Sequence, residues 1–257
     1  MLGAIIGDLA GSVYEYDQIE GAKPVKIKNI IEKDAFYSDD TILTIAILDA
    51  VLNNVDYETK LKEYAKKFEN ILPNHKPYFK TMFSPSFTKW ANDNINGQSC
   101  GNGAMMRISP IGFLFNTEKE VIKQARLATI PSHNSREAIE CAKTIALIIF
   151  YSRKGLSKQE IIKKMNISYK KPKLTTFNYT CSQTIDLCLY SFFNATSFED
   201  SIKVAISFGG DTDTNASIVG SMAEAFYGID KNLKNQALAK LPKEFVELIQ
   251  RAYTKLS

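Results

Sequence analysis

Two short acidic clusters are the residues of this chain best suited to chemistry. The first is Ser38-Asp39-Asp40-Thr41 and the second is Asp211-Thr212-Asp213-Thr214, and each runs directly into an apolar helical pattern. Adjacent carboxylates repel one another, so gathering four of them is costly unless a positive charge lies between them. Carboxylate and hydroxyl oxygens with no Cys or His beside them suit Mg²⁺ or Mn²⁺ better than Zn²⁺. Four carboxylates would balance two such ions.

Each cluster considered alone has a simpler interpretation as a helix cap. Ser38 or Asp39 could cap the first helix, and Asp211 or Asp213 could cap the second. Capping accounts for one Asp on each helix, but it leaves the second Asp unexplained. Nor does it explain the Gly209-Gly210 pair, which brings the backbone close just before the second cluster. Considered jointly, the two clusters favour a shared metal site.

The spacing of apolar residues predicts an almost entirely α-helical chain. The expected helices cover residues 3–14, 40–53, 57–70, 118–128, 135–151, 158–165, 181–193, 198–206, 215–226 and 243–256. Pro24 to Ile30 and Leu174 to Tyr179 are strand candidates that a loop would explain equally well. No repeat, low-complexity tract or linker divides the chain, so we expect one compact domain over residues 1–257.

Composition indicates a globular protein in a reducing compartment, and we expect a cytoplasmic location. A 257-residue chain with 45% hydrophobic residues can bury a core. Its net charge is +4, and its lysines are spread through the helical segments, which indicates a solvated surface and not a nucleic-acid footprint. Cys181 and Cys188 lie on an apolar helical pattern, so we expect core residues and no disulfide. Asp8 within the apolar N-terminal stretch argues against a signal peptide, and no apolar run could span a bilayer.

The first expected helix carries a stripe of glycine and two acidic residues. Gly3, Gly7 and Gly11 recur at every fourth position, which would let another backbone pack closely against this helix. Asp8 and Glu15 are seven residues apart and would project from about the same face of a continuous helix. One of them could therefore serve the acidic site, with Glu15 near the end of the helix.

The segment from Gln98 to Arg107 is the strongly glycine-marked loop of the chain. Successive N–H groups in such a turn can bind an anion, and glycine permits close approach to phosphate, although Gly-Asn-Gly also marks ordinary tight turns. The segment matches neither a P-loop nor the dinucleotide fingerprint. The chain has two histidines, His75 and His133, and a structural role explains each more simply than a catalytic one. No Gly-x-Ser-x-Gly elbow is present, which disfavours acyl transfer.

Taken in order, these motifs resemble the ADP-ribosylglycohydrolase family, and the resemblance covers nearly the whole chain. That family includes the dinitrogenase reductase-activating glycohydrolases and the ADP-ribosyl-acceptor hydrolases. The motifs are Gly7-Asp8-Leu9-Ala10-Gly11-Ser12-x-x-Glu15, Ser38-Asp39-Asp40-Thr41, Gly101-Asn102-Gly103 with Arg107 and Pro110, His133, and Gly209-Gly210-Asp211-Thr212-Asp213-Thr214. The resemblance implies a compact all-α fold with two Mg²⁺ or Mn²⁺ ions at the floor of a cleft. It also implies an enzyme that hydrolyses the glycosidic bond between ADP-ribose and its acceptor.

The same resemblance implies a role for each site residue. The implied metal ligands are Ser38, Asp39, Asp40, Asp211, Asp213 and Thr214. The implied catalytic residues are Glu15, Asp40 and Asp213. The implied contacts to the diphosphate and distal ribose are Ser99, Cys100, Gly101, Asn102, Gly103, Ala104, Met105 and His133. Two departures concern the ligand: Met105 stands where relatives usually carry a small residue, and residues 70–96 match no motif of the family.

The expected partner is an ADP-ribosylated acceptor, with a protein preferred and nucleic acid or a small molecule as alternatives. We expect no membrane partner, and a monomer is favoured. Two other functions stay open at this point: a non-catalytic relative, either crystallin-like or ADP-ribose-binding, and a binuclear-metal phosphohydrolase. The complete set of acidic residues, together with Glu15, weighs against the non-catalytic alternative, because a structural protein has no evident need for them.

Overall fold

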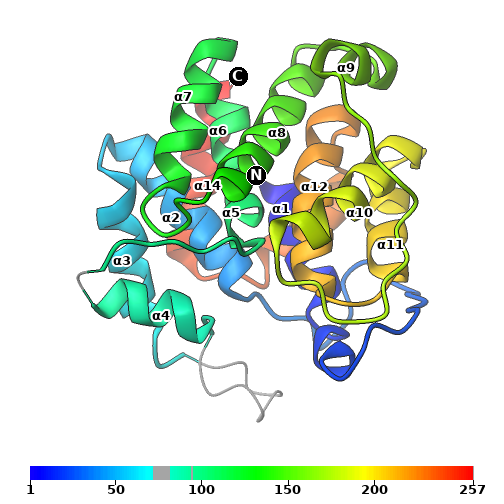
Figure 1. Cartoon of the computed structure of the whole chain (residues 1–257), viewed down its shortest axis with the longest axis horizontal. Coiled ribbons are helices and arrows are strands. Elements are labelled where there is room, and N and C mark those ends of the chain that lie inside the picture. The colour runs from blue at the N-terminus through cyan, green and yellow to red at the C-terminus, as the bar shows by residue number, and fades with distance from the viewer. Residues whose placement is uncertain (72–81, 94, 257) are drawn as a thin grey trace.

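The computed structural model describes residues 1–71, 82–93 and 95–256, and over these ranges the chain is a bundle of helices with no β-strand (Figure 1). The extended backbone forms only isolated bridges there, Gln98 with His133 and Gly101 with Thr180. The all-α prediction is confirmed. Neither strand candidate forms a strand, since residues 24–30 and 174–179 have irregular backbone. His75 lies outside the described residues.

The helices follow one another along the chain with short connections. They are α1 (Leu2–Gly11), η1 (Glu15–Gln18), α2 (Asp39–Asn53), α3 (Tyr57–Phe68), α4 (Pro85–Asn92), α5 (Gly103–Met106), α6 (Ser109–Leu114), α7 (Glu118–Thr129), α8 (Arg136–Arg153), α9 (Lys158–Met165), α10 (Cys181–Asn194), α11 (Phe198–Ser207), α12 (Thr212–Tyr227), α13 (Lys231–Leu238) and α14 (Lys243–Leu256). Every long helix expected from the apolar pattern is present. The apolar pattern did not predict α4, α5, α6 or α13, each of which has at most eight residues.

Local capping explains why several helices begin where they do. The hydroxyls of Thr117, Ser157 and Thr180 each accept a hydrogen bond from the backbone three residues later, and a Glu or Gln there bonds back to the capping residue. These reciprocal pairs satisfy N–H groups that an isolated helix start would leave without partners. The starts of α7, α9 and α10 are therefore encoded locally.

Helices α1 and α12 lie side by side at the centre of the bundle, in backbone contact (Figure 1). A Cβ on Gly7 would lie 2.0 Å from the carbonyl oxygen of Ala216. A Cβ on Gly11 would lie 2.3 Å from the Cα of Asp213, within the second acidic cluster. Gly3 is equally close to α12, so the predicted packing role of the glycine stripe is confirmed.

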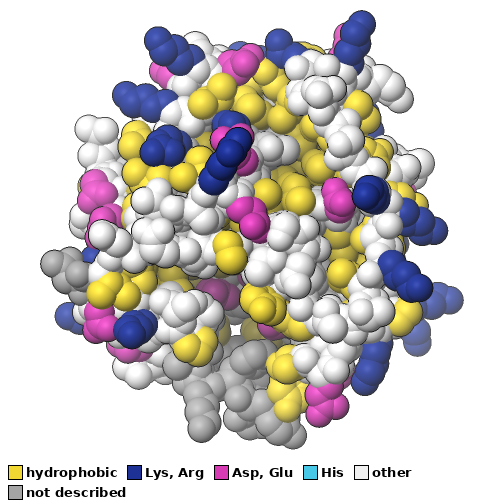
Figure 2. Space-filling view, in the orientation of Figure 1, with side chains coloured by type: hydrophobic (Ala, Val, Ile, Leu, Met, Phe, Trp, Pro, Cys, Tyr) yellow, Lys and Arg dark blue, Asp and Glu magenta, His cyan; other side chains and the backbone are white. Residues whose placement is uncertain are grey.

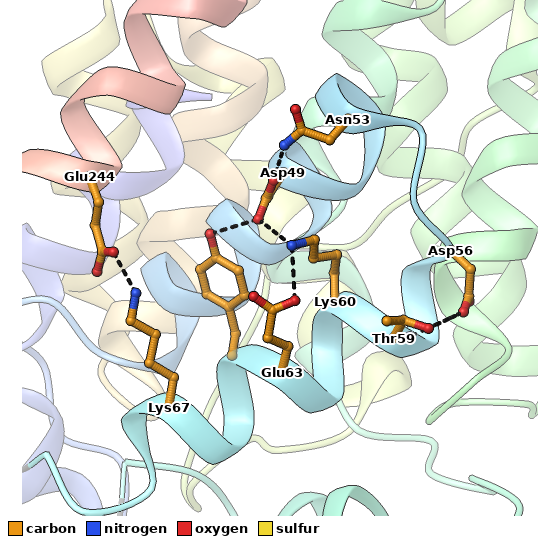
Figure 3. Close-up of polar contacts among 9 residues, drawn as sticks. Asp49, Asn53, Asp56, Thr59, Lys60, Glu63, Lys67 and Glu244 are labelled. Atoms are coloured by element: carbon orange, nitrogen blue, oxygen red, sulfur yellow. Dashed lines mark hydrogen bonds and ion pairs between the residues drawn. The ribbon is translucent and has the colours of Figure 1, made fainter.

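A polar cluster fixes α3 against α2, away from the acidic residues discussed below (Figure 3). The carboxylate of Asp49 accepts from the Tyr64 hydroxyl at 3.1 Å and pairs with the Lys60 ammonium at 3.0 Å. Asn53, one turn along α2, also donates to Asp49. Asp49 is thus a carboxylate whose hydrogen-bond partners fully account for its burial.

The distribution of surface charge and the state of the cysteines match the expectations drawn from the sequence. In Figure 2 the Lys and Arg side chains are scattered around the outline of the visible face and form no single patch. All four cysteines are free, and Cys181 and Cys188 are buried, as predicted. Among the described helices, none combines the length and the apolar character needed to cross a bilayer.

Replacing Gly7 with Ala should destabilise the fold, although Ala is the better helix former by about 1 kcal/mol. The new methyl group would overlap the α12 backbone, and overpacking typically costs about 1–3 kcal/mol. Chemical denaturation of the variant measures this loss. Gln236→Ala, an exposed position in α13, is the control for helix propensity and should leave stability within about 0.5 kcal/mol. A Gly7→Ala protein as stable as the parent would contradict the close α1–α12 contact.

Candidate active site

The two acidic clusters meet in space, together with acidic residues from the first helix and the turn after it. Carboxylate oxygens of Asp8, Asp40 and Asp213 lie within 4.8 Å of one another. Oxygens of Glu15, Asp211 and Asp213 form a second group of the same size. Asp213 belongs to both groups, so one carboxylate joins two potential cation sites.

Helix capping does not account for these acids. Ser38 caps α2, since its hydroxyl accepts from the Asp40 N–H at 3.2 Å. Asp211 occupies the corresponding position of α12, yet its side chain makes no capping hydrogen bond. The capping role therefore belongs to one hydroxyl, and the carboxylates of both clusters are left for another purpose.

Asp8 supports the first cluster from α1. One of its oxygens accepts from the Ser38 N–H at 2.9 Å, the Thr41 N–H at 3.0 Å and the Thr41 hydroxyl at 2.5 Å. The other accepts from the Ser38 hydroxyl at 2.8 Å. Burial, and then the charge of Asp213, raise the pKa of Asp8 to about 7, although these donors act in the opposite direction. Because its lone pairs are largely occupied by donors from the start of α2, Asp8 orients that helix start.

Glu15 reaches the second group because the first helix stops early. The sequence pattern extended this helix to residue 14, but α1 ends at Gly11 and Glu15 opens the 3-10 helix η1. The change of direction takes Glu15 to Asp211 and Asp213, while Asp8 stays beside Asp40. Burial first, and then the nearby Asp213 and Asp211 charges, raise the pKa of Glu15 well above its usual value.

The residues of both clusters fit divalent cations. Burial, followed by the charge of neighbouring carboxylates, raises the pKa values of Asp39, Asp40 and Asp213 well above the ordinary range. Oδ1 of Asp40 is buried and has no hydrogen-bond partner among the described residues, while Oδ2 accepts from the Thr214 hydroxyl at 3.1 Å. A cation would give the unpaired oxygen a partner and favour the ionised carboxylates. The donors are all oxygens, which suits Mg²⁺ or Mn²⁺.

A buried amide network holds the second cluster in place. Asn178 accepts from the Asp211 N–H at 2.9 Å and donates to Thr184 at 2.9 Å and to Asn215 at 2.8 Å. Asn102 donates to the Asp211 carboxylate at 2.6 Å. No motif in the sequence marks Asn178 for this role, and the structure places it in irregular backbone.

The Gly209-Gly210 pair makes this network sterically feasible. Both residues have φ of +73°, in the left-handed region that glycine adopts without strain. A Cβ on Gly210 would also lie 2.2 Å from Oδ1 of Asn178. The expected close backbone approach before the second cluster is confirmed. Gly210 approaches Asn178, and a Cβ on Gly209 would lie 2.2 Å from the carbonyl oxygen of Lys23.

The acidic groups lie beside a cleft of about 910 Å³. Of the residues predicted to hold metal or act in catalysis, the cleft is lined by Glu15, Asp39, Asp211, Asp213 and Thr214, whereas Ser38 and Asp40 are buried and do not line it. Of the residues predicted to contact the ligand, it is lined by Ser99, Cys100, Gly101, Asn102, Gly103 and His133. Ala104 and Met105 do not line it, because the short helix α5 buries both in the core.

Comparison with known proteins identifies the family. The family model of the ADP-ribosylglycohydrolases matches residues 1–257. The chain belongs to the ADP-ribosylglycohydrolase family.

Individual relatives are distant but align over most of their length. The chain is 22% identical to the ADP-ribosylarginine hydrolase Tri1 of Pseudomonas putida, over 97% of this chain and 72% of that protein. It is also 22% identical to the ADP-ribosylhydrolase ARH3 of Homo sapiens, over 90% of this chain and 85% of that protein. A solved structure described as an ADP-ribosylglycohydrolase-related protein complex has a TM-score of 0.71 at 19% identity, covering 100% of this chain and 97% of its own. This similarity shows a shared fold.

The glycine-marked turn uses part of its backbone amides for its own structure. The Gly101 N–H donates to the Ser99 hydroxyl at 3.0 Å, and the Asn102 N–H donates to the Tyr179 carbonyl at 2.9 Å. These two amides hold the turn in shape. Anion binding by this turn stays a prediction, with fewer amides available for it than the motif alone suggested.

An aromatic wall from α4 and the residues just before it completes the cleft. Phe83, Phe87 and Trp90 line it, and their rings contact one another in tilted pairs with centroids 5.4 and 5.3 Å apart. They come from the part of residues 70–96 that the structure describes, a stretch in which the sequence showed no family motif. Their contribution to the cleft was therefore not foreseen.

Asp213→Asn should abolish metal binding without destabilising the metal-free protein. Removing one charge from both acidic groups relieves repulsion but deletes a shared ligand. For the parent protein, Mg²⁺ at 100 times its dissociation constant should raise the unfolding free energy by about 2.7 kcal/mol. Thermal unfolding with and without Mg²⁺ or Mn²⁺, alongside calorimetric titration, measures both effects.

Asp49→Asn is the matched control, because Asp49 is a buried carboxylate outside the site. This variant should lose stability but keep the metal-dependent increase. An Asp213→Asn protein that binds metal as tightly as the parent would contradict the site.

Asn178→Ala should weaken metal binding although Asn178 lies in neither carboxylate group. Its loss removes the partner of the Asp211 N–H and of the side chains of Asn215 and Thr184, so Asp211 keeps its hydrogen bond from Asn102 but loses the one to Asn178. Loss of such supporting hydrogen bonds typically lowers metal affinity by about 10- to 100-fold. Calorimetric titration measures the change, and unaltered affinity in a folded variant would show that Asp211 is oriented without Asn178.

Proposed function

We propose that this protein is a Mg²⁺- or Mn²⁺-dependent enzyme that removes ADP-ribose from an acceptor by hydrolysing an N- or O-glycosidic bond. The observation that carries the proposal is the meeting of two carboxylate groups, which share Asp213, beside a cleft of about 910 Å³. Family membership and the printed names of its relatives support the reaction class.

The two acidic clusters would hold two ions. The proposed ligands are Ser38, Asp39, Asp40, Asp211, Asp213 and Thr214. When bound, such ions supply positive charge that can hold ribose hydroxyls and lower the pKa of a water molecule. Asp8 and Asn178 act behind these ligands, since their hydrogen bonds go to the start of α2 and to Asp211.

Glu15 is the residue we assign to proton transfer. Cleavage at C1 of the distal ribose builds positive, oxocarbenium-like charge, and a carboxylate beside it can take the proton from the attacking water. Glu15 lines the cleft and lies next to Asp213, so it is within reach of a sugar held at the acidic floor. The Gly101–Gly103 turn and His133 line the same cleft and would contact the diphosphate and distal ribose.

A protein is the acceptor that we favour, with nucleic acid and small molecules as further candidates. The name of the relative Tri1 specifies ADP-ribosylarginine, which makes an arginine linkage the first to test. Incubation with Mg²⁺ or Mn²⁺ and a panel of defined ADP-ribosyl linkages separates the alternatives. Released ADP-ribose supports the proposal, absence of turnover indicates a non-catalytic binding relative, and a cleaved diphosphate indicates a phosphohydrolase.

Glu15→Gln should separate chemistry from binding. If Glu15 moves a proton, hydrolysis should fall by about 10²- to 10⁴-fold while metal and ADP-ribose affinities stay within a few-fold. Single-turnover kinetics beside calorimetric titration of ADP-ribose provide both numbers. Asp17→Asn, an exposed position on the same 3-10 helix, is the control and should behave as the parent.

The alternative for Glu15 is service as a metal ligand, since it belongs to one of the two carboxylate groups. In that case Glu15→Gln would lose metal affinity together with turnover. Turnover within about threefold of the parent would remove Glu15 from the reaction altogether, because that is far below the usual general acid–base effect.

A further inference from the structure

Arg107 is a buried charge that the proposed chemistry leaves unexplained. Its side chain is fully buried at the end of α5, and its Nη2 donates to the Ser132 hydroxyl at 2.7 Å and to the Ala128 carbonyl at 3.4 Å. Nε and Nη1 have no hydrogen-bond partner in the described part of the chain. A guanidinium buried with unpaired N–H groups lowers stability, so its presence calls for another explanation.

The hydrogen bond from Arg107 to Ser132 connects Arg107 with a histidine. The Ser132 hydroxyl that accepts from Arg107 also lies 2.7 Å from Nδ1 of His133. Arg107 borders the cleft, but its unpaired nitrogens are buried away from solvent. Its hydrogen bonds lead through Ser132 to His133, and its charge also acts on Asp39.

The hydrogens in this chain of contacts follow from what each group can donate. A guanidinium only donates, so the Ser132 oxygen accepts from Arg107 and keeps its own single proton. Nδ1 of His133 is the acceptor that the structure places within reach of that proton. In a neutral imidazole the remaining proton then resides on Nε2. Burial, and then the Arg107 charge, lower the pKa of His133 well below its usual value, which favours the neutral ring.

We infer that Arg107 and Ser132 are positioning residues that fix His133 as its Nε2–H tautomer, a neutral hydrogen-bond donor beside the Gly101–Gly103 turn. Nε2 lies 3.5 Å from the place of a Cβ on Gly101 and 3.4 Å from that of a Cβ on Gly103. The absence of side chains at both glycines leaves this nitrogen open to a ligand.

The tautomer of His133 determines which ligand groups can bind to its Nε2. An Nε2–H group donates to an oxygen that accepts, such as a phosphate or a ribose oxygen, and offers no lone pair to a donor-only group. The positive charge of Arg107 behind it adds to the attraction for an anionic ligand. Assigning that oxygen to ADP-ribose rests on the proposed function, whereas the tautomer itself does not.

The tautomer of His133 can be measured directly while Arg107 and Ser132 are kept unchanged. In His75→Asn protein labelled with ¹⁵N, His133 is the only histidine, so long-range ¹H–¹⁵N correlation reports its ring alone. We expect a protonated Nε2 and an unprotonated Nδ1 at neutral pH. A protonated Nδ1, in either the neutral or the charged ring, would overturn the inference.

Ser132→Ala, made in the His75→Asn protein, tests whether the Ser132 hydroxyl fixes the tautomer. Without the hydroxyl that donates to Nδ1, the Nδ1–H tautomer should become detectable, and ADP-ribose affinity should fall by up to about 10-fold, the order expected for one hydrogen bond. Ser132→Thr, which keeps the hydroxyl, should retain both properties, and circular dichroism checks that each variant is folded. A folded Ser132→Ala protein that keeps the Nε2–H tautomer would overturn the role of Ser132.

The two proposals fail differently. If the parent protein does not bind or hydrolyse ADP-ribosyl compounds, the proposed function is wrong, and the spectrum of His133 still decides the tautomer. If ADP-ribose binds but Nδ1 carries the proton, only the present inference is wrong.

Discussion

The backbone contact between α1 and α12 is the constraint on which the site depends. Where Gly11 meets Asp213, no side chain separates the two helices. This contact brings Asp8 on one helix within 4.8 Å of Asp213 on the other. A side chain at Gly7 or Gly11 would push the helices apart and separate the carboxylates that must share a cation. The glycine stripe is thus a structural feature with a functional consequence.

Electrostatics then opposes what the packing brings together. Several carboxylates are buried at one place, and burial and mutual repulsion both favour their protonated forms. The protein offsets part of this cost with fixed donors: Ser38 and Thr41 bond to Asp8, and Asn102 bonds to Asp211. The starts of α2 and α12 add the positive ends of their dipoles. Oδ1 of Asp40 still has no hydrogen-bond partner in the described structure. At this atom the protein's own donors do not offset the cost of burying the carboxylate.

The sequence revealed the parts of this arrangement that repeat or cluster. The long helices follow from apolar periodicity, and the α1 packing surface follows from the spacing of Gly3, Gly7 and Gly11. The acidic centre follows from two short clusters that each contain two Asp residues. Asn178 was not foreseen, because a single polar residue in irregular backbone carries no periodic signal. The partners of Arg107 were equally hidden: Ser132 lies beside His133 in sequence, but its contact with Arg107 spans 25 positions. Ala104 and Met105 show the converse: the glycine-rich motif looks like a uniform loop in sequence, but the turn of α5 buries these two residues in the core.

These hidden residues share one physical role, which explains why they lie outside the motifs. Ligands and proton carriers must be particular chemical groups, so they stand out in a sequence by type. Residues that orient them need only one donor or acceptor at the right place, and Asn, Ser and Thr supply such groups throughout the chain. Their identity therefore becomes visible only when the fold supplies distances, as between Asn178 and Asp211. The same reasoning applies to Arg107, whose charge would be anomalous in the core if it served packing alone. A site of this kind is set as much by fixed amides and hydroxyls behind the acids as by the acids themselves.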